Sequence, residues 1–109
     1  MDNEGPPNNE SIEIETEEVL ERLRATGPDD PETMKFVMEW TFQQEELVRR
    51  VNTSKATMMF NILRSDVYLA AGDKDEALQC LEEARMQAHQ EDEETLYNMI
   101  MKKMDEIEG

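Results

Sequence analysis

The apolar positions of residues 54–90 form two helical patterns that are separated by a short polar break. In the first pattern, residues 54–71, apolar side chains occupy two roughly opposite faces of a helix. A helix that is apolar on both sides is usually covered on both flanks, so this segment is predicted to be central. The second pattern, residues 74–90, is a narrower stripe of leucines and alanines, which predicts one buried face and one exposed face.

The break between the two patterns carries the residues that end one helix and begin the next. Gly72 suits the left-handed conformation that ends a helix, because it has no Cβ. Asp73 can then cap the following helix, and Glu76 stands at the three-residue spacing of a capping box. The sequence therefore predicts a tight helix–turn–helix at this point.

The turn and the helix after it resemble part of a known repeat. Residues 72–78 read GDKDEAL, and Leu81 and Ala84 follow. This pattern resembles the turn and second helix of a tetratricopeptide repeat, and the similarity covers about residues 58–91, which is one repeat. The resemblance implies a helical hairpin that serves as a peptide-binding or protein-binding scaffold.

The first helix of the hairpin departs from that repeat. Asn61 and Arg64 occupy positions where the repeat buries large apolar side chains. No second copy stands at the repeat spacing on either side, although such arrays are stabilised by stacking at least about three units. Kinship with the family and convergent hairpin chemistry both account for the similarity.

Further helices are predicted on both sides of the hairpin. A short helix over residues 16–26 should end at Gly27-Pro28, and Asp30-Pro31 should begin a second helix that reaches about residue 51. The polar residues 52–54 form either a turn or a slight interruption. The sequence does not decide whether residues 31–71 form one helix or two.

The helix that begins at Asp30-Pro31 carries a seam at alternating spacings of three and four. Its members are Val37, Trp40, Gln44, Leu47 and Val51. Two heptads are too few for a coiled coil, so we interpret the seam as the buried face of a bundle helix, with Trp40 in the core. A last helix should begin at about Glu93, with Asp92 as its cap.

These elements predict an all-α protein of about five helices, arranged as a small antiparallel bundle or as stacked helical hairpins. Residues 1–10 have nothing to bury and are predicted to be a disordered acidic tail. Residues 11–109 should form a single helical domain, which suits a chain of 109 residues.

Charge is the dominant feature of the composition. The chain has 27 acidic and 11 basic residues, a net charge of −16 and an isoelectric point near 4.2. Binding to the phosphates of nucleic acid, or to an anionic membrane surface, requires clustered Lys and Arg, so neither is expected. The charge favours a basic protein partner, or reflects only a solvated acidic surface or an adaptation to salt.

Motifs for chemistry are missing from the sequence. His89 is the only histidine, the four glycines are scattered, and the single cysteine, Cys80, is interpreted as a small buried apolar residue. We therefore expect no enzymatic activity, no cofactor and no metal. A cytoplasmic location is expected, because no leader and no run of about 18 apolar residues is found.

Two features suggest candidate partner-binding residues. Some helices have more apolar residues than a single packing face needs, and Arg49-Arg50 is the one strongly basic point of the chain. A flexible methionine surface can adapt to several partners, although the same side chains could fill the core. The candidates are Met58, Ile62, Leu69, Met99, Met101, Arg49 and Arg50.

The function that these observations favour is a non-catalytic protein–protein interaction module, such as an adaptor, a small chaperone or a regulator. Its acidic surface would meet a basic partner, and a homodimer through the second or the last helix is possible. The alternative is an acidic mimic of nucleic acid that inhibits a DNA-binding protein.

Overall fold

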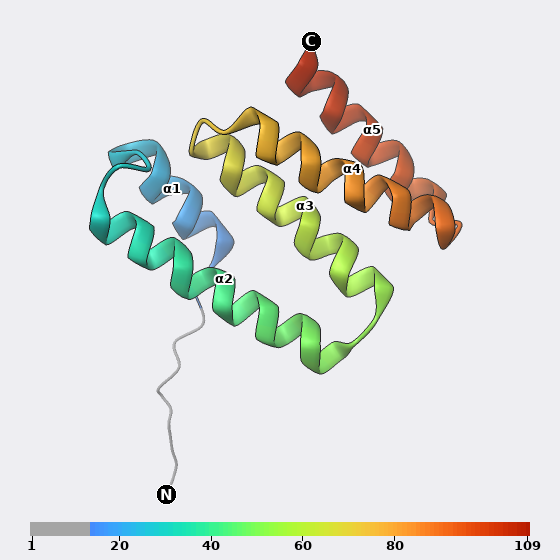
Figure 1. The fold of residues 1–109 in the computed structure, drawn as a ribbon, viewed down its shortest axis with the longest axis horizontal. Coiled ribbons are helices and arrows are strands. Elements are labelled where there is room, and N and C mark those ends of the chain that lie inside the picture. Colours follow the sequence, from blue (N-terminus) through green and yellow to red (C-terminus); the bar gives the residue numbers. More distant parts are fainter. Residues whose placement is uncertain (1–13) are drawn as a thin grey trace, which may run out of the picture.

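A computed structural model describes residues 14–109, which form five helices and no strand within that range (Figure 1). The prediction of an all-α fold with five helices is confirmed. The predicted tail, residues 1–10, lies outside the described residues, as do residues 11–13. The helices are α1 (Thr16–Thr26), α2 (Pro31–Val51), α3 (Ser54–Ala70), α4 (Lys74–Gln90) and α5 (Glu94–Glu108).

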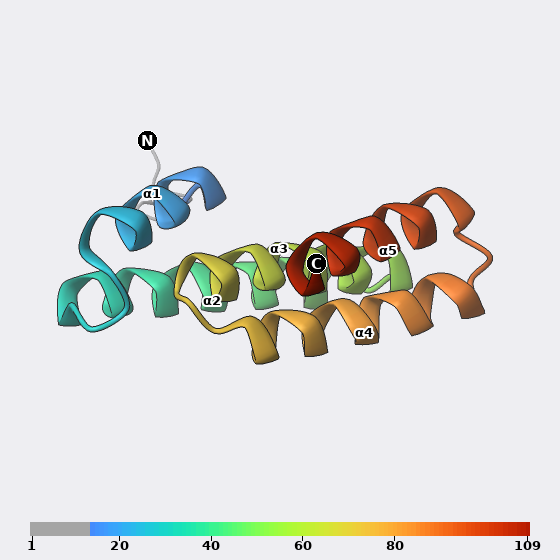
Figure 2. The ribbon, with the colours of Figure 1, turned by 90° about the horizontal axis from the view of Figure 1, so that it is seen from above.

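The helices form a stack of antiparallel hairpins with α3 at its centre. α1 and α2 make the first hairpin and α3 and α4 the second, and α5 turns back along α4 (Figure 1). α3 packs against α1, α2 and α4. Seen from above, α1 and α5 lie toward the same side of the molecule, whereas α4 lies toward the other (Figure 2). The first and last helices therefore flank one face of α3.

Local capping explains where the helices begin and end. Asn52 takes a left-handed conformation with φ 56°, and the Thr53 hydroxyl accepts a bond of 3.1 Å from the backbone N–H of Ala56. Residues 31–71 therefore contain two helices. The predicted break after α3 is also confirmed, because Gly72 has φ 84° and the Asp73 carboxylate accepts from the Glu76 N–H at 3.2 Å.

The start of α5 differs from the prediction. Asp92 is not its cap: it has φ 56° and lies in the turn after α4, whereas Glu93 precedes the helix without a side-chain capping bond. A left-handed residue cannot present its side chain to the next helix in the manner of a cap, which needs an extended backbone. Asp92 and Glu93 are both acidic and both suit the start of a helix, so residue type alone does not choose between them. The turn between α4 and α5 places Asp92 in the left-handed conformation, and the helix therefore starts one residue later than predicted.

The buried apolar residues form two clusters on opposite sides of α3. The first lies among α1, α2 and α3 and the second among α3, α4 and α5, so the prediction that α3 is covered on both flanks is confirmed. The first cluster contains Val19, Leu20, Leu23, Val37, Trp40, Phe60 and Val67. The second contains Met58, Ile62, Leu81, Ala84, Ala88 and Ile100.

The predicted seam of α2 is buried over only part of its length. Trp40 is 1% exposed, whereas Leu47 is 44% and Val51 is 55% exposed. The cause is length: α1 has 11 residues and α2 has 21, which at about 1.5 Å per residue leaves nearly half of α2 without a neighbour from α1. Among the described residues, no helix combines the length and the apolar composition needed to cross a membrane.

Candidate functional site

The candidate site is a groove that runs along α3 between α1 and α5. Two adjoining cavities, of about 280 and 470 Å³, share Asp66 and Leu69 on α3. The smaller cavity is also lined by residues from α4 and α5, and the larger one by residues from α1. We treat the two cavities as one site, the α1–α3–α5 groove. It is lined by Glu17, Leu20, Arg24, Ser65, Asp66, Leu69, Ala70, Lys74, Leu81, Lys103, Glu106 and Ile107.

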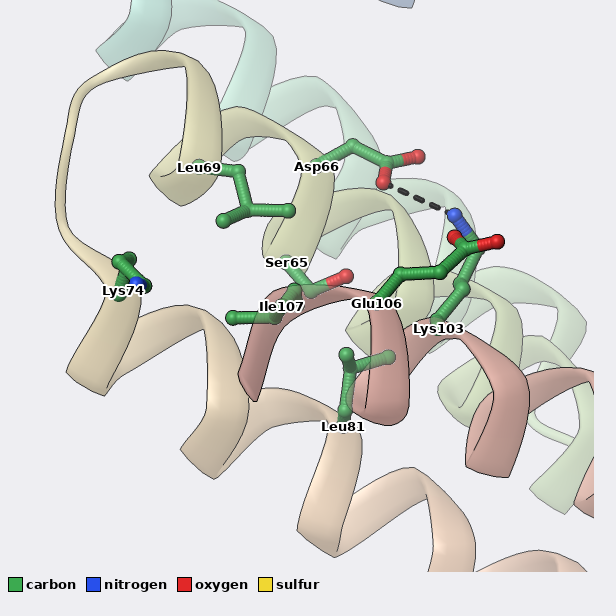
Figure 3. Close-up of a pocket in the computed structure, with 8 residues that line it drawn as sticks. All are labelled: Ser65, Asp66, Leu69, Lys74, Leu81, Lys103, Glu106 and Ile107. Atoms are coloured by element: carbon green, nitrogen blue, oxygen red, sulfur yellow. Dashed lines mark hydrogen bonds and ion pairs between the residues drawn. The ribbon is translucent and has the colours of Figure 1, made fainter. Parts of the chain in front are cut away.

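An ion pair joins the floor of the groove to its wall on α5. The Lys103 ammonium donates to the Asp66 carboxylate at 3.1 Å, and both side chains are about one-third exposed, at 33% and 31% (Figure 3). Leu69 from α3, Leu81 from α4 and Ile107 from α5 line the same cavity. The smaller half of the groove therefore combines apolar side chains with charged ones, because Lys74 and Glu106 line it together with the ion pair.

The groove has a different electrostatic character from the rest of the chain. It is lined by three cations, Arg24, Lys74 and Lys103, and by three anions, Glu17, Asp66 and Glu106. These charges cancel, although the chain as a whole carries −16. The excess of negative charge is therefore carried by residues outside the groove lining.

Two exposed methionines lie toward the first turns of α3 and α5, on the helix faces that line the groove. Met59 is 39% and Met99 is 37% exposed. Met59 precedes Asp66 by seven residues on α3, and Met99 precedes Lys103 by four residues on α5. Residues at these spacings lie on the same face of a helix. Each methionine therefore continues a helix face that already lines the groove.

The structure corrects two of the predicted partner-binding residues. Met58 is completely buried and Ile62 is 4% exposed, because both belong to the cluster that α4 and α5 cover. A partner cannot reach these side chains in the folded chain. Met58 and Ile62 are core residues, as the alternative interpretation of the sequence has it.

The other predicted residues are scattered. Leu69 lies at the centre of the groove, Met99 is exposed and Met101 is half-buried. Arg49 and Arg50 are exposed at the end of α2, outside the groove, and Arg49 pairs with Glu46 at 2.5 Å. Sequence reasoning missed Asp66 and Lys103, which are 37 residues apart and carry no local signal of their contact.

Cys80 and His89 occupy different surroundings. Cys80 is 4% exposed, and burial raises the pKa of its thiol above the usual value. His89 is exposed and its ring packs against Tyr97 with centroids 6.1 Å apart, next to Asp92 and Glu93. Among the described residues, no group of three or more His, Cys, Asp or Glu is placed to hold a metal ion.

The burial of Cys80 gives a direct prediction. The native thiol should react with a disulfide reagent at pH 8 more slowly than the urea-unfolded chain, by a factor on the order of a hundred, because the thiolate is both disfavoured and shielded. Absorbance of the released thiol measures both rates. Equal rates would mean that Cys80 is accessible in the native protein.

Comparisons with known proteins add no relative: no family model matches the chain, and no curated protein and no solved structure matches it. The similarity of residues 58–91 to a tetratricopeptide-repeat hairpin therefore stays a resemblance. The fold and the groove are the evidence from which a function can be argued.

Proposed function

We propose that this chain is a non-catalytic protein-interaction module, acting as an adaptor, a small chaperone or a regulator, and that it binds a segment of a partner protein in the α1–α3–α5 groove. The observation that carries the proposal is the composition of the groove. Apolar side chains from Leu20, Leu69 and Ile107 lie between charged groups of both signs. This combination suits an amphipathic peptide segment.

Apolar and charged residues of the groove would contribute to binding in different ways. Apolar side chains of the partner would be removed from water against Leu69 and Ile107, which favours binding by about 25 cal/mol per Å² of apolar surface buried. Arg24 and Lys74 could meet carboxylates at the edges, and Glu17 and Glu106 could meet basic groups. The methionines at positions 59 and 99 would let the groove accept more than one shape.

The charge of the whole chain supports a basic partner. A net charge of −16 creates an attractive potential for a cationic protein well before contact, and this raises the association rate. The effect falls as salt screens it, over a Debye length of about 10 Å at 0.1 M. We therefore expect association to slow with salt, while dissociation, which depends on contacts in the groove, changes less.

The experiment that tests the groove uses a displayed library of random peptides and the pair of variants Leu69→Gln and Met86→Gln. Met86 is a matched control, because it is an exposed apolar residue, 52% accessible, on α4 and outside the groove. Selected peptides should be apolar and basic. Leu69→Gln should weaken their binding about tenfold or more, as expected for a lost apolar contact at the centre of the site.

Met86→Gln should leave the same affinities within about twofold. Chemical shifts of the labelled protein should change at Leu69, Asp66 and Lys103 when a selected peptide is added. Perturbations that cluster elsewhere, or an equal loss in both variants, would rule out the groove as the binding site.

The alternative function, a mimic of nucleic acid, receives less support. It needs a continuous row of carboxylates on one face to imitate phosphates. Along α4, the exposed acids are interrupted by Gln79 and Met86, and Glu82 is paired with Arg85, whose hydrogen bond lowers the pKa of that carboxyl. We therefore favour the interaction module.

A further inference from the structure

α2 lies at the edge of the stack and presents an unusual face to solvent. Its close packing partners among the described helices are α1 and α3. On its outer side stand Phe42, 63% exposed, and Met38, 56% exposed, which are the most exposed large apolar side chains in the described part of the chain. Trp40, between them in sequence, is buried on the opposite side. The exposed pair thus belongs to a second face of α2 that no described helix covers.

The exposed pair is part of a regular stripe. Five residues follow one another at spacings of three, four, three and four, which places them along one face of a helix. All five are exposed. We call them the outer stripe of α2: Lys35, Met38, Phe42, Glu45 and Arg49.

The order of residues in the outer stripe is self-complementary. It begins with a base, continues through two apolar residues, and ends with an acid and a base. If a second copy of α2 lies antiparallel about a two-fold axis at residue 40, Lys35 faces Glu45 of that copy and Met38 faces its Phe42. Arg49 then lies opposite Pro31 and next to Glu32, another exposed acid. Every charged group in the stripe has an opposite charge within reach.

Other arrangements lack this match. A parallel pair would set Lys35 against Lys35 and Glu45 against Glu45, and like charges at such positions oppose pairing. A uniformly basic partner helix would be repelled by Lys35 and Arg49, and a uniformly acidic one by Glu45. A symmetric dimer requires a patch that complements itself, and the outer stripe has that property.

We propose that the outer stripe of α2 is the surface through which two copies of this chain pair in an antiparallel, two-fold symmetric dimer. The apolar centre consists of Met38 and Phe42 from each copy, flanked on each side by a pair between Lys35 and Glu45. One helix of each copy forms the interface, so we expect a weak dimer with a dissociation constant on the order of 100 µM. Residues of the α1–α3–α5 groove come from other helices, so both grooves stay open in the dimer.

Charge reversal tests the proposal. The full chain is studied by sedimentation equilibrium in 150 mM salt, which screens the repulsion between two chains of net charge −16. Lys35→Glu and Glu45→Lys should each weaken dimerisation about tenfold, because each places two like-charge pairs in the symmetric interface. Both residues are exposed, and circular dichroism checks that each variant folds.

A mixture of the Lys35→Glu and Glu45→Lys variants gives the most specific test of the pairing. In a mixed dimer, every Glu at position 35 or 45 faces a Lys, so an equimolar mixture should recover wild-type affinity, and so should the double variant. Glu45→Lys also lowers the net negative charge, so an effect of overall repulsion alone would strengthen its dimerisation. Lys55→Glu, a charge reversal on an exposed residue of α3, is the matched control and should change the affinity less than twofold.

Three results would overturn the proposal: a wild-type chain that stays monomeric at 1 mM, a Glu45→Lys variant that dimerises as well as wild type, or a mixture of single variants that fails to pair. Phe42→Ala gives an independent readout, since removal of the central ring should abolish the dimer and leave the helix content unchanged.

Discussion

Replacing Trp40 by Ala is expected to lower the free energy of unfolding by about 3–5 kcal/mol. The indole is 1% exposed and packs in the first core cluster, with its ring centroid 6.2 Å from that of Phe60 on α3. Its N–H donates to the Thr16 hydroxyl on α1 at 3.1 Å. One side chain therefore joins α1, α2 and α3, and its removal leaves a cavity at the point where the three helices meet.

The measurement is urea unfolding followed by circular dichroism, since Trp40 is the only tryptophan and its removal abolishes the fluorescence signal. Phe42→Ala is the matched control: it removes a large ring two residues away, from a position that is 63% exposed, and should change stability by no more than about 0.5 kcal/mol. Trp40→Phe should recover part of the loss, because it keeps apolar volume but not the bond to Thr16. Similar losses at positions 40 and 42 would contradict the burial of the indole.

The helices could be predicted from sequence because their boundaries depend on local chemistry. Gly72 and Asp73 end and cap their helices through contacts within four residues, so the break is visible without knowledge of the fold. The position of Trp40 was also predictable, because it lies at the centre of a periodic apolar seam. The same periodic pattern predicts that Leu47 and Val51 are buried, but both are exposed. Their exposure depends on the length of α1, and the pattern in α2 gives no information on that length.

The candidate site was harder to predict than the fold. The sequence indicated that α3 is apolar on two faces, but Met58 and Ile62 could only be assigned to the core once α4 and α5 were placed over them. Leu69 was singled out as an excess apolar residue, and its place in the lining of the groove depends on α1 and α5 lying on either side. The pair of Asp66 and Lys103 carries no sequence signal, because exposed charges are abundant throughout the chain.

The division of the core into two clusters has a consequence for stability. α5 supplies no residue to the first cluster, and its close packing partner is α4. A change confined to the second cluster can therefore loosen α5 without unfolding α1 and α2. Local opening of this kind has a free energy below that of global unfolding. Because Lys103, Glu106 and Ile107 line the groove, the stability of α5 also controls the proposed site.

Replacing Ile100 by Ala is expected to destabilise α5 by about 2–5 kcal/mol. Ile100 is 0% exposed and is the one fully buried residue of α5, packed in the cluster with Leu81, Ala84 and Ala88. The alanines opposite are small, so they cannot fill the space that the lost side chain leaves. Amide hydrogen exchange should quicken in α5 by a factor of about 30 or more, whereas amides in α1 and α2 should keep their protection.

Met99→Ala is the matched control, because it removes a side chain of similar size from the neighbouring position, which is 37% exposed, and introduces the same residue, alanine. It should change exchange in α5 by less than about threefold. Uniformly faster exchange in all five helices of Ile100→Ala would mean that the two clusters unfold as one unit. Selective loss in α5, together with weaker binding of groove-selected peptides, would show that the last helix is docked by one side chain and holds one wall of the groove in place.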